Sequence, residues 1–218
     1  MDRPRICLAI VDNDREALRE AEPLADLLEV RLDLVGPGWP ELAKSVRRPW
    51  IATDRRKEEG GRGETSEAER EAVLLRAVEA GASIVDIEYQ TGNLAEFVPL
   101  LKARVECLIS YHDLSGTPSF EALSSIVENQ IKAGADICKV VTFARDTADN
   151  LTVLRLVHEY RKSRIVAFAM GEAGRISRVL SPLAGAYFTY ASIRKGKESA
   201  QGQLSIEELK QIFRYLAQ

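Results

Sequence analysis

The chain has few of the features that mark nucleic-acid-binding, membrane or secreted proteins. Its 218 residues carry 30 Lys and Arg against 33 Asp and Glu, so the basic surface expected of a nucleic-acid-binding domain is missing. No apolar run approaches the roughly 20 residues that span a bilayer. The N-terminal sequence MDRPRICLAIV lacks the charged, apolar and small-residue order of a signal peptide. We therefore expect a cytoplasmic protein with no nucleic-acid partner and no membrane association.

Cysteine is also scarce. Cys7, Cys107 and Cys138 are odd in number, far apart, and each lies inside an apolar run. This pattern is typical of buried free thiols rather than of disulfides or metal ligands. We expect neither a disulfide framework nor a metal site.

What the chain does contain is a regular alternation of short apolar runs and helical patterns. Strands are predicted near 5–11, 27–33, 50–54, 84–88, 106–111, 136–143, 164–170 and 186–190. Helices are predicted near 13–21, 40–46, 64–80, 93–103, 119–133, 147–161, 173–180 and 205–217. Such alternation indicates parallel strands joined by right-handed crossovers. Eight units in 218 residues predict one α/β domain over residues 1–218, a (β/α)8 TIM barrel.

An open doubly wound sheet is the alternative for the same alternation. Its dinucleotide-binding form carries G-x-G-x-x-G after the first strand, and no such sequence follows residues 5–11. Local signals agree with the predicted helices. Asp12 or Asn13 and Ser119 stand where N-caps are expected, and Gly81 and Gly134 follow helices where a left-handed residue is common.

Lys139 is the residue that least matches its surroundings. It lies inside an apolar strand, on the same face as Ile137 and Val141. Strand lysines often lie on solvated edges, but neither face of this strand is polar enough to be solvated. Burial disfavours the ammonium form and so favours the free amine, which attacks carbonyl groups to form a Schiff base. The preceding strand ends in His112, a side chain suited to moving protons near neutral pH.

Further polar residues stand at the predicted strand ends, where the loops of a barrel build its active site. The second strand places Glu29, Arg31 and Asp33 on one face. Other residues of this kind are Thr53, Asp54, Arg55, Asp86, Glu88 and Asp113, with Arg178 early in the helix 173–180. A charged, glycine-rich loop at 56–63 is expected to be mostly solvated. The convergence of polar residues on one rim predicts an active site there.

Seven short motifs, in order along nearly the whole chain, resemble those of type I 3-dehydroquinate dehydratases. They are E-x-R-x-D at 29–33, T-x-R at 53–55 with E-G-G at 59–61, D-x-E at 86–88, S-x-H-D at 110–113, A-D-x-x-K at 135–139, G-x-x-S-R at 174–178 and S-A-x-G-Q at 199–203. Any one of them is weak, but seven in order are specific. The chain departs from the family pattern at Gln201, where proline is common, and at Phe168, where methionine is common.

The resemblance implies a cofactor-free dehydration of 3-dehydroquinate to 3-dehydroshikimate in the shikimate route to aromatic amino acids. It also implies that Lys139 forms the imine, that His112 moves the protons, and that Glu59 orients His112, with Asp86 as a second candidate for that role. Arg178 is implied to clamp the substrate carboxylate. The other implied substrate contacts are Glu29, Arg31, Arg55, Ser199 and Gln203. Members of the family are usually homodimers, so a homodimer is implied as well.

Two other functions remain open at this point. A class I aldolase acting on a sugar phosphate would also use a Schiff base. It would require a phosphate cradle after the last two strands, and Gly171, Gly174 and Gly185 offer only a thin one. A catalytically silent barrel, serving as a binding or regulatory subunit, would form no imine with any keto acid.

The loop at 194–203 has the composition of a mobile segment. It contains Gly196 and Gly202 together with several charges, yet it ends in Ser199 and Gln203, which can hydrogen-bond a hydroxylated ligand. We expect it to close over bound substrate as a lid.

Overall fold

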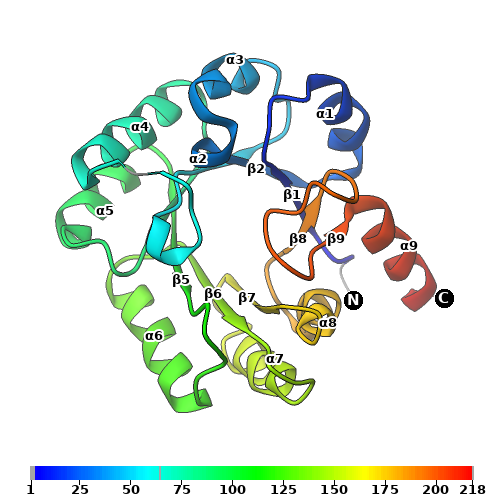
Figure 1. Cartoon of the computed structure of the whole chain (residues 1–218). Helices are drawn as coiled ribbons and strands as arrows, with labels where there is room; N and C mark the ends of the chain where they lie inside the picture. The colour runs from blue at the N-terminus through cyan, green and yellow to red at the C-terminus, as the bar shows by residue number, and fades with distance from the viewer. Residues whose placement is uncertain (1–2, 64, 218) are drawn as a thin grey trace.

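Eight parallel strands curl into a ring at the centre of the structure (Figure 1). The structure is a computed structural model that describes residues 3–63 and 65–217. The sheet order is β7-β6-β5-β4-β3-β2-β1-β8-β9, and every recorded pairing is parallel. The strands are β1 (Ile6–Ile10), β2 (Leu27–Arg31), β3 (Trp50–Thr53), β4 (Ile84–Glu88), β5 (Glu106–His112), β6 (Ile137–Phe143), β7 (Ile165–Met170), β8 (Thr189–Ser192) and the short β9 (Leu204–Ser205).

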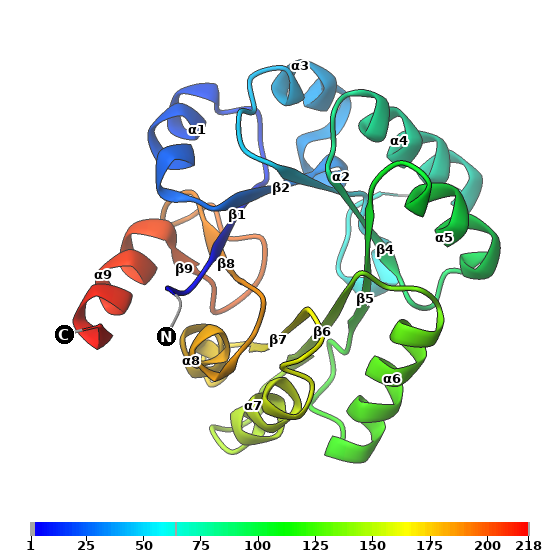
Figure 2. The same ribbon diagram turned by 180° about the vertical axis from the view of Figure 1, so that it is seen from behind.

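Helices surround this ring on the outside, as the views from both ends show (Figures 1 and 2). The α-helices are α1 (Arg15–Ala21), α2 (Leu32–Val35), α3 (Trp39–Ala43), α4 (Glu67–Glu79), α5 (Leu94–Lys102), α6 (Phe120–Lys132), α7 (Asp149–Glu159), α8 (Arg175–Ala184) and α9 (Ile206–Leu216). Three 3-10 turns, η1 (Glu22–Leu24), η2 (Gly36–Gly38) and η3 (Lys57–Glu59), lie in the connections. The predicted (β/α)8 TIM barrel is confirmed.

The ring closes between β7 and β8 without a ladder of backbone hydrogen bonds. The N–H of Tyr187 donates to the carbonyl of Ile165 at 2.7 Å, at the amino end of β7. Further along, the rings of Phe168 in β7 and Tyr190 in β8 pack edge to face, with centroids 5.8 Å apart. Side-chain packing therefore closes this seam, and it brings Tyr190 into the barrel interior.

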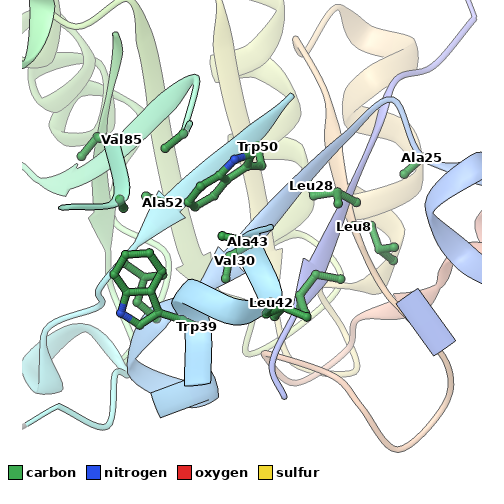
Figure 3. Packing of buried hydrophobic residues seen from close by; sticks show 14 of the residues in the cluster. Leu8, Ala25, Leu28, Val30, Trp39, Leu42, Ala43, Trp50, Ala52 and Val85 are labelled. Carbon is green, nitrogen blue, oxygen red and sulfur yellow. The ribbon is translucent and has the colours of Figure 1, made fainter. Parts of the chain in front are cut away.

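Alternation along the strands separates two kinds of core. In β6, Ile137 and Val141 belong to the cluster inside the barrel, whereas Cys138 and Val140 pack outward under the helices. Lys139 lies on the inward face with the first pair, as predicted. On the opposite side of the barrel, a larger outer core fills the space between β1–β4 and the helices α1–α5 (Figure 3).

The predicted second strand was too long. β2 ends at Arg31, and Leu32 and Asp33 begin the short helix α2. The carboxylate of Asp33 is therefore not on the strand face with Glu29. It turns back to accept two hydrogen bonds from Arg31, from Nε at 2.8 Å and from Nη2 at 2.7 Å.

Other helix and strand boundaries differ from the predicted ones by a few residues. The N-cap of α1 is Asp14, whose side chain accepts from Ala17 N, so the prediction of Asp12 or Asn13 was wrong. Ser119 caps α6 as predicted, and Gly81 and Gly134 have positive φ angles of 99° and 95°. Helix α4 begins at Glu67; position 64, where that helix was predicted to start, lies outside the described residues. The eighth strand runs later than predicted, and β9 was not predicted.

The three cysteines are buried and free, which confirms the prediction from their spacing. Over the described ranges, the helices are too short or too polar to cross a membrane.

Candidate active site

A pocket opens at the carboxyl ends of the strands, and the residues that the resemblance assigns to the site line it, except Asp86, the second candidate for orienting His112. Its volume is about 220 Å³, which suits a small metabolite. The predicted residues that it brings together are Glu29, Arg31, Arg55, Glu59, His112, Lys139, Arg178, Ser199 and Gln203. They come from six places in the fold: strands β2, β5 and β6, helix α8, and the loops after β3 and β8.

Lys139 is 4% exposed and projects from the middle of β6 into this pocket. Its Nζ lies 3.0 Å from Asp86 Oδ2, 3.2 Å from the hydroxyl of Tyr190 and 3.4 Å from Glu29 Oε1. The ring centroid of Tyr190 is 4.5 Å from Nζ. Two carboxylates and an aromatic side chain thus compensate the burial of the ammonium.

The two carboxylates near Lys139 have different partners. Asp86 accepts from Arg55 Nη2 at 2.6 Å and from Ser110 Oγ at 2.6 Å. Burial alone would raise the pKa of Asp86, but Arg55 and Lys139 hold it well below its usual range. Glu29 instead accepts from two hydroxyls, those of Thr53 at 3.0 Å and Tyr190 at 3.1 Å. Asp86 is therefore a fixed counter-charge, while Glu29 depends on neutral donors and on Lys139.

Arg55 links Asp86 to a second buried carboxylate. Its Nη1 donates to Glu88 Oε1 at 3.0 Å and to Ser110 Oγ at 2.6 Å. Glu88 also accepts from Arg70 on helix α4. Burial opposes the charge of Arg55, but Asp86 and Glu88 raise its pKa well above the usual value. Because these contacts occupy Arg55, it forms part of the floor of the pocket.

His112 ends β5 and pairs with Glu59 from the loop after β3. The distance from Nδ1 to Glu59 Oε2 is 2.7 Å. Burial, followed by the charges of Arg55 and Lys139, holds the pKa of His112 well below its usual value. Burial also raises the pKa of Glu59 to about 7, although Arg55 opposes this shift. Above that pH, neutral His112 donates from Nδ1 to the carboxylate, which leaves Nε2 as a proton acceptor.

The turn that holds Glu59 requires glycine. A Cβ on Gly61 would lie 1.8 Å from the carbonyl oxygen of Arg55, so a side chain cannot be accommodated there. Gly60 has a φ of 87°, in the left-handed region. The sequence E-G-G therefore folds the loop tightly against β3 and directs Glu59 toward His112.

Among the described residues of the site, Arg178, in α8, is a cation without a carboxylate partner. It is 1% exposed, and its guanidinium lies 4.4 Å from the ring centroid of Phe168. Its Nη2 donates to the carbonyl of Gln201 at 3.2 Å, and its Nε finds no partner within residues 3–63 and 65–217. Burial, with a smaller contribution from Arg175, lowers the pKa of Arg178 to about 9. A buried cation without a carboxylate is a ready site for an anion.

Ser199 and Gln203 come from the loop after β8. Gln203 Oε1 accepts from the backbone N–H of Ser199 at 2.7 Å and from its hydroxyl at 3.2 Å. Next to them, Gly202 lies so close to β7 that a Cβ would be 2.3 Å from the carbonyl oxygen of Gly171. Ion pairs join the same loop to the loop after β1, from Lys197 to Asp12 at 2.6 Å and from Arg194 to Asp14 at 2.8 Å. Ser199, Ala200 and Gln203 of this loop line the pocket.

Two contacts of Lys139 were missed or underrated in the sequence. Tyr190 stands in a run of apolar and aromatic residues, which is typical of core and gives no signal of its hydrogen bonds. Asp86 was considered only as a helper of His112, yet it lies closest to Lys139. The parallel register pairs Asp86 with Leu108 and Leu108 with Ile137, so Asp86 is level with a residue two positions before Lys139 on the same face of β6. His158 is exposed on α7.

The fold and the pocket define a barrel enzyme with a buried lysine, a histidine–carboxylate pair and a buried arginine. A profile described as type I 3-dehydroquinase matches residues 6–218, so the chain belongs to the type I 3-dehydroquinase family of hydro-lyases.

Named relatives agree with this assignment. The 3-dehydroquinate dehydratase of Dehalococcoides mccartyi is 43% identical, over 98% of this chain and 96% of the relative. That of Methanocaldococcus jannaschii is 36% identical, over 97% and 98%. The crystal structure of the Geobacillus kaustophilus enzyme has a TM-score of 0.86 at 28% identity, covering 99% of this chain and 92% of the other. A type I enzyme of Clostridium difficile, with covalently modified comenic acid, also has a TM-score of 0.86, at 25% identity, over 98% and 92%.

The pair of His112 and Glu59 generates a prediction for NMR. At pH 8 the ring nitrogens of His112 should report a neutral imidazole protonated at Nδ1, because Glu59 accepts that proton. Its pKa is lowered, so the ring should remain neutral as the pH falls to about 6.5, the ordinary value for histidine. In a His158→Gln variant His112 is the remaining histidine, so the spectrum of this variant assigns the His112 signals. A midpoint at or above 6.5, or protonation at Nε2, would contradict this description of the pair.

Proposed function

We propose that this protein converts 3-dehydroquinate to 3-dehydroshikimate and water through an imine on Lys139, as a step of the shikimate route to aromatic amino acids. The observation that carries the proposal is the single pocket that holds a buried lysine, a neutral histidine and an unpaired arginine. The substrate is a keto acid with several hydroxyls. Each of its functional groups has a chemical counterpart among these side chains.

Lys139 acts as the nucleophile. Its amine attacks the ketone carbon, and loss of water gives an iminium, which is a better electron sink than a ketone. The proton on the neighbouring carbon then becomes removable. This chemistry involves no net oxidation or reduction, so it requires no cofactor. The covalently modified comenic acid in the Clostridium difficile relative agrees with covalent chemistry in this family.

His112 acts as the general acid and base. Its Nε2 takes the proton next to the iminium, and the resulting imidazolium then donates a proton to the departing hydroxyl. Glu59 fixes the tautomer through Nδ1 and stabilises the imidazolium by its negative charge. General acid–base groups typically contribute about 10² to 10⁴-fold to the rate, so the orientation of His112 by Glu59 matters for turnover.

Arg178 binds the substrate carboxylate. It is the buried cation with spare hydrogen-bond donors, whereas Arg31 is held by Asp33 and Arg55 by Asp86 and Glu88. Charge-assisted bonds from a guanidinium to a carboxylate are strong and directional. The hydroxyls of the substrate are left to polar groups around the pocket: Glu29, Arg31, Arg55, Ser199 and Gln203.

The loop 194–203 acts as a lid that excludes water from the imine. Its contact at Gly202 and Gly171 and its ion pairs with the β1 loop support a closed position over the pocket. We extend the proposal to a cytoplasmic enzyme, with one catalytic domain, that works as a homodimer.

Family membership favours dehydration over the aldolase and the silent barrel. An aldolase for sugar phosphates would use several backbone amides around a phosphate, whereas Arg178 is one guanidinium that stacks on Phe168. A silent barrel has no use for a buried lysine beside a neutral histidine. Formation of the conjugated product from 3-dehydroquinate, followed by ultraviolet absorbance, tests the proposed activity. Absence of turnover by the folded protein would reject it.

Arg178 and Arg175 offer a matched pair of substitutions on α8. Arg178→Met should reduce kcat/KM by about 30-fold or more, since losing one partner of a buried charge pair typically costs about 2 kcal/mol or more. Arg175→Met should leave the value close to wild type, because Arg175 is largely exposed and pairs with Glu172. Equal effects of the two variants in steady-state kinetics would remove Arg178 as the carboxylate ligand.

Two glycines test the lid in the same way. Gly202 and Gly196 have similar positive φ angles, 77° and 85°, so alanine strains the backbone equally at both. Only at Gly202 would the new Cβ also strike the carbonyl of Gly171; at Gly196 no described atom lies within 4 Å. Gly202→Ala should lower kcat/KM by roughly 10²-fold through misplacement of the lid, and Gly196→Ala should not. Similar kinetics for both variants would argue against closure on Gly171.

A further inference from the structure

Among the described residues, the hydroxyl of Tyr190 is the neutral hydrogen-bond partner of Lys139 Nζ, beside the carboxylates of Asp86 and Glu29. It lies 3.2 Å from Nζ and 3.1 Å from Glu29 Oε1, so it bridges the lysine and a carboxylate. Tyr190 is 3% exposed, and its ring is fixed between Phe168 and Phe188 at centroid distances of 5.8 and 5.4 Å. A hydroxyl held in this way can accept from the lysine and donate to the glutamate at the same time.

Imine formation requires that the ammonium of Lys139 first lose a proton. Asp86 is nearest, but its Oδ2 already accepts from Arg55 at 2.6 Å. The two cations also keep its pKa low, which makes it a poor base. Glu29 has no such guanidinium partner within the described residues, but its direct distance from Nζ is 3.4 Å. That is longer than the usual 2.7–3.2 Å of N–H···O hydrogen bonds. The contact from Nζ to the Tyr190 hydroxyl, at 3.2 Å, is within that range, and the contact from this hydroxyl to Glu29, at 3.1 Å, is about 0.1 Å beyond the usual 2.5–3.0 Å of O–H···O bonds.

We propose that Tyr190 relays a proton from the amino group of Lys139 to Glu29 and thereby activates the lysine for attack on the ketone. This inference rests on the proposed function. An N–H proton moves to the Tyr190 oxygen while the Tyr190 O–H proton moves to Glu29. Tyr190 is a neutral phenol before and after the step, and Glu29 becomes a neutral acid.

The remaining steps balance without another reactant. The freed lone pair forms the N–C bond, and the electron pair of the carbonyl π bond moves to oxygen. The ammonium begins with three protons, the iminium keeps one, and two leave with the carbonyl oxygen as water. Glu29 returns its proton in that water and is again a carboxylate. Burial, with Glu29 and Cys7 adding to it, raises the pKa of Tyr190 well above its usual value, so the phenol stays protonated and able to donate.

Tyr190→Phe tests the relay because it removes the hydroxyl and keeps the ring. Enzyme and 3-dehydroquinate are mixed, quenched with borohydride at successive times, and the adduct on Lys139 is quantified by mass spectrometry. We expect imine formation to be about tenfold slower or more. This minimum is below the roughly 10² to 10⁴-fold of typical acid–base groups because the direct 3.4 Å path from Nζ to Glu29 remains. Affinity for quinate, which carries the carboxylate and hydroxyls but no ketone, should not change.

Tyr187→Phe is the matched control. Tyr187 lies at the amino end of the barrel, where its hydroxyl is 3.5 Å from Arg164 Nη1, so its loss should leave imine formation unchanged. A combined Tyr190→Phe and Glu29→Gln variant should form the imine no more slowly than Glu29→Gln alone, because one relay cannot be broken twice. The solvent deuterium isotope effect on imine formation should also be smaller in Tyr190→Phe, a change that a purely structural role would not produce.

The results separate this inference from the proposed function. If the wild-type protein labels Lys139 and Tyr190→Phe labels it equally fast, the relay is wrong while the imine mechanism stands. Independent, multiplicative effects of Tyr190→Phe and Glu29→Gln on the rate of imine formation would also overturn the relay. Absence of turnover and of any label in the wild-type protein would instead reject the proposed function.

Discussion

The burial of one ammonium group inside the barrel is the constraint on which the site depends. An interior lysine is tolerated only with close counter-charges, and here Asp86 and Glu29 provide them from β4 and β2. Asp86 is in turn held by Arg55, and Glu88 by Arg55 and Arg70, so the charges alternate from the pocket floor out to helix α4. Removing any inner member would leave a buried charge without its partner.

The cations of the pocket differ in whether a carboxylate of the protein neutralises them. Arg55 and Arg31 are neutralised by carboxylates of the protein, whereas Arg178 stacks on Phe168 and keeps free donors. Burial, followed by the charges of Arg55 and Lys139, lowers the pKa of His112, so its ring is neutral. Within the described residues, the pocket thus holds an imidazole with a free Nε2, an amino group in contact with the hydroxyl of Tyr190, and a buried guanidinium without a carboxylate partner. These are the groups that a dehydration through an imine requires.

Much of this arrangement could be predicted from the sequence, and the failures have physical causes. The barrel was predicted from the alternation of short apolar runs with helical patterns. Lys139 was identified because it interrupts an apolar strand. Asp33 was placed on the strand because its alternation with Leu32 continues that of β2, but the chain turns into α2 and the pair with Arg31 forms across that turn. Tyr190 was missed because an aromatic residue in an apolar run gives no sign of where its hydroxyl points.

Borohydride trapping with 3-dehydroquinate, followed by peptide mapping, is the decisive measurement of whether Lys139 carries the covalent intermediate. We expect an adduct on Lys139 in the wild-type protein and none in Lys139→Met. The adduct should also form in a His112→Ala variant, in which turnover is impaired. An adduct on Lys195 or Lys197 instead, or full turnover with no trapped adduct, would contradict it.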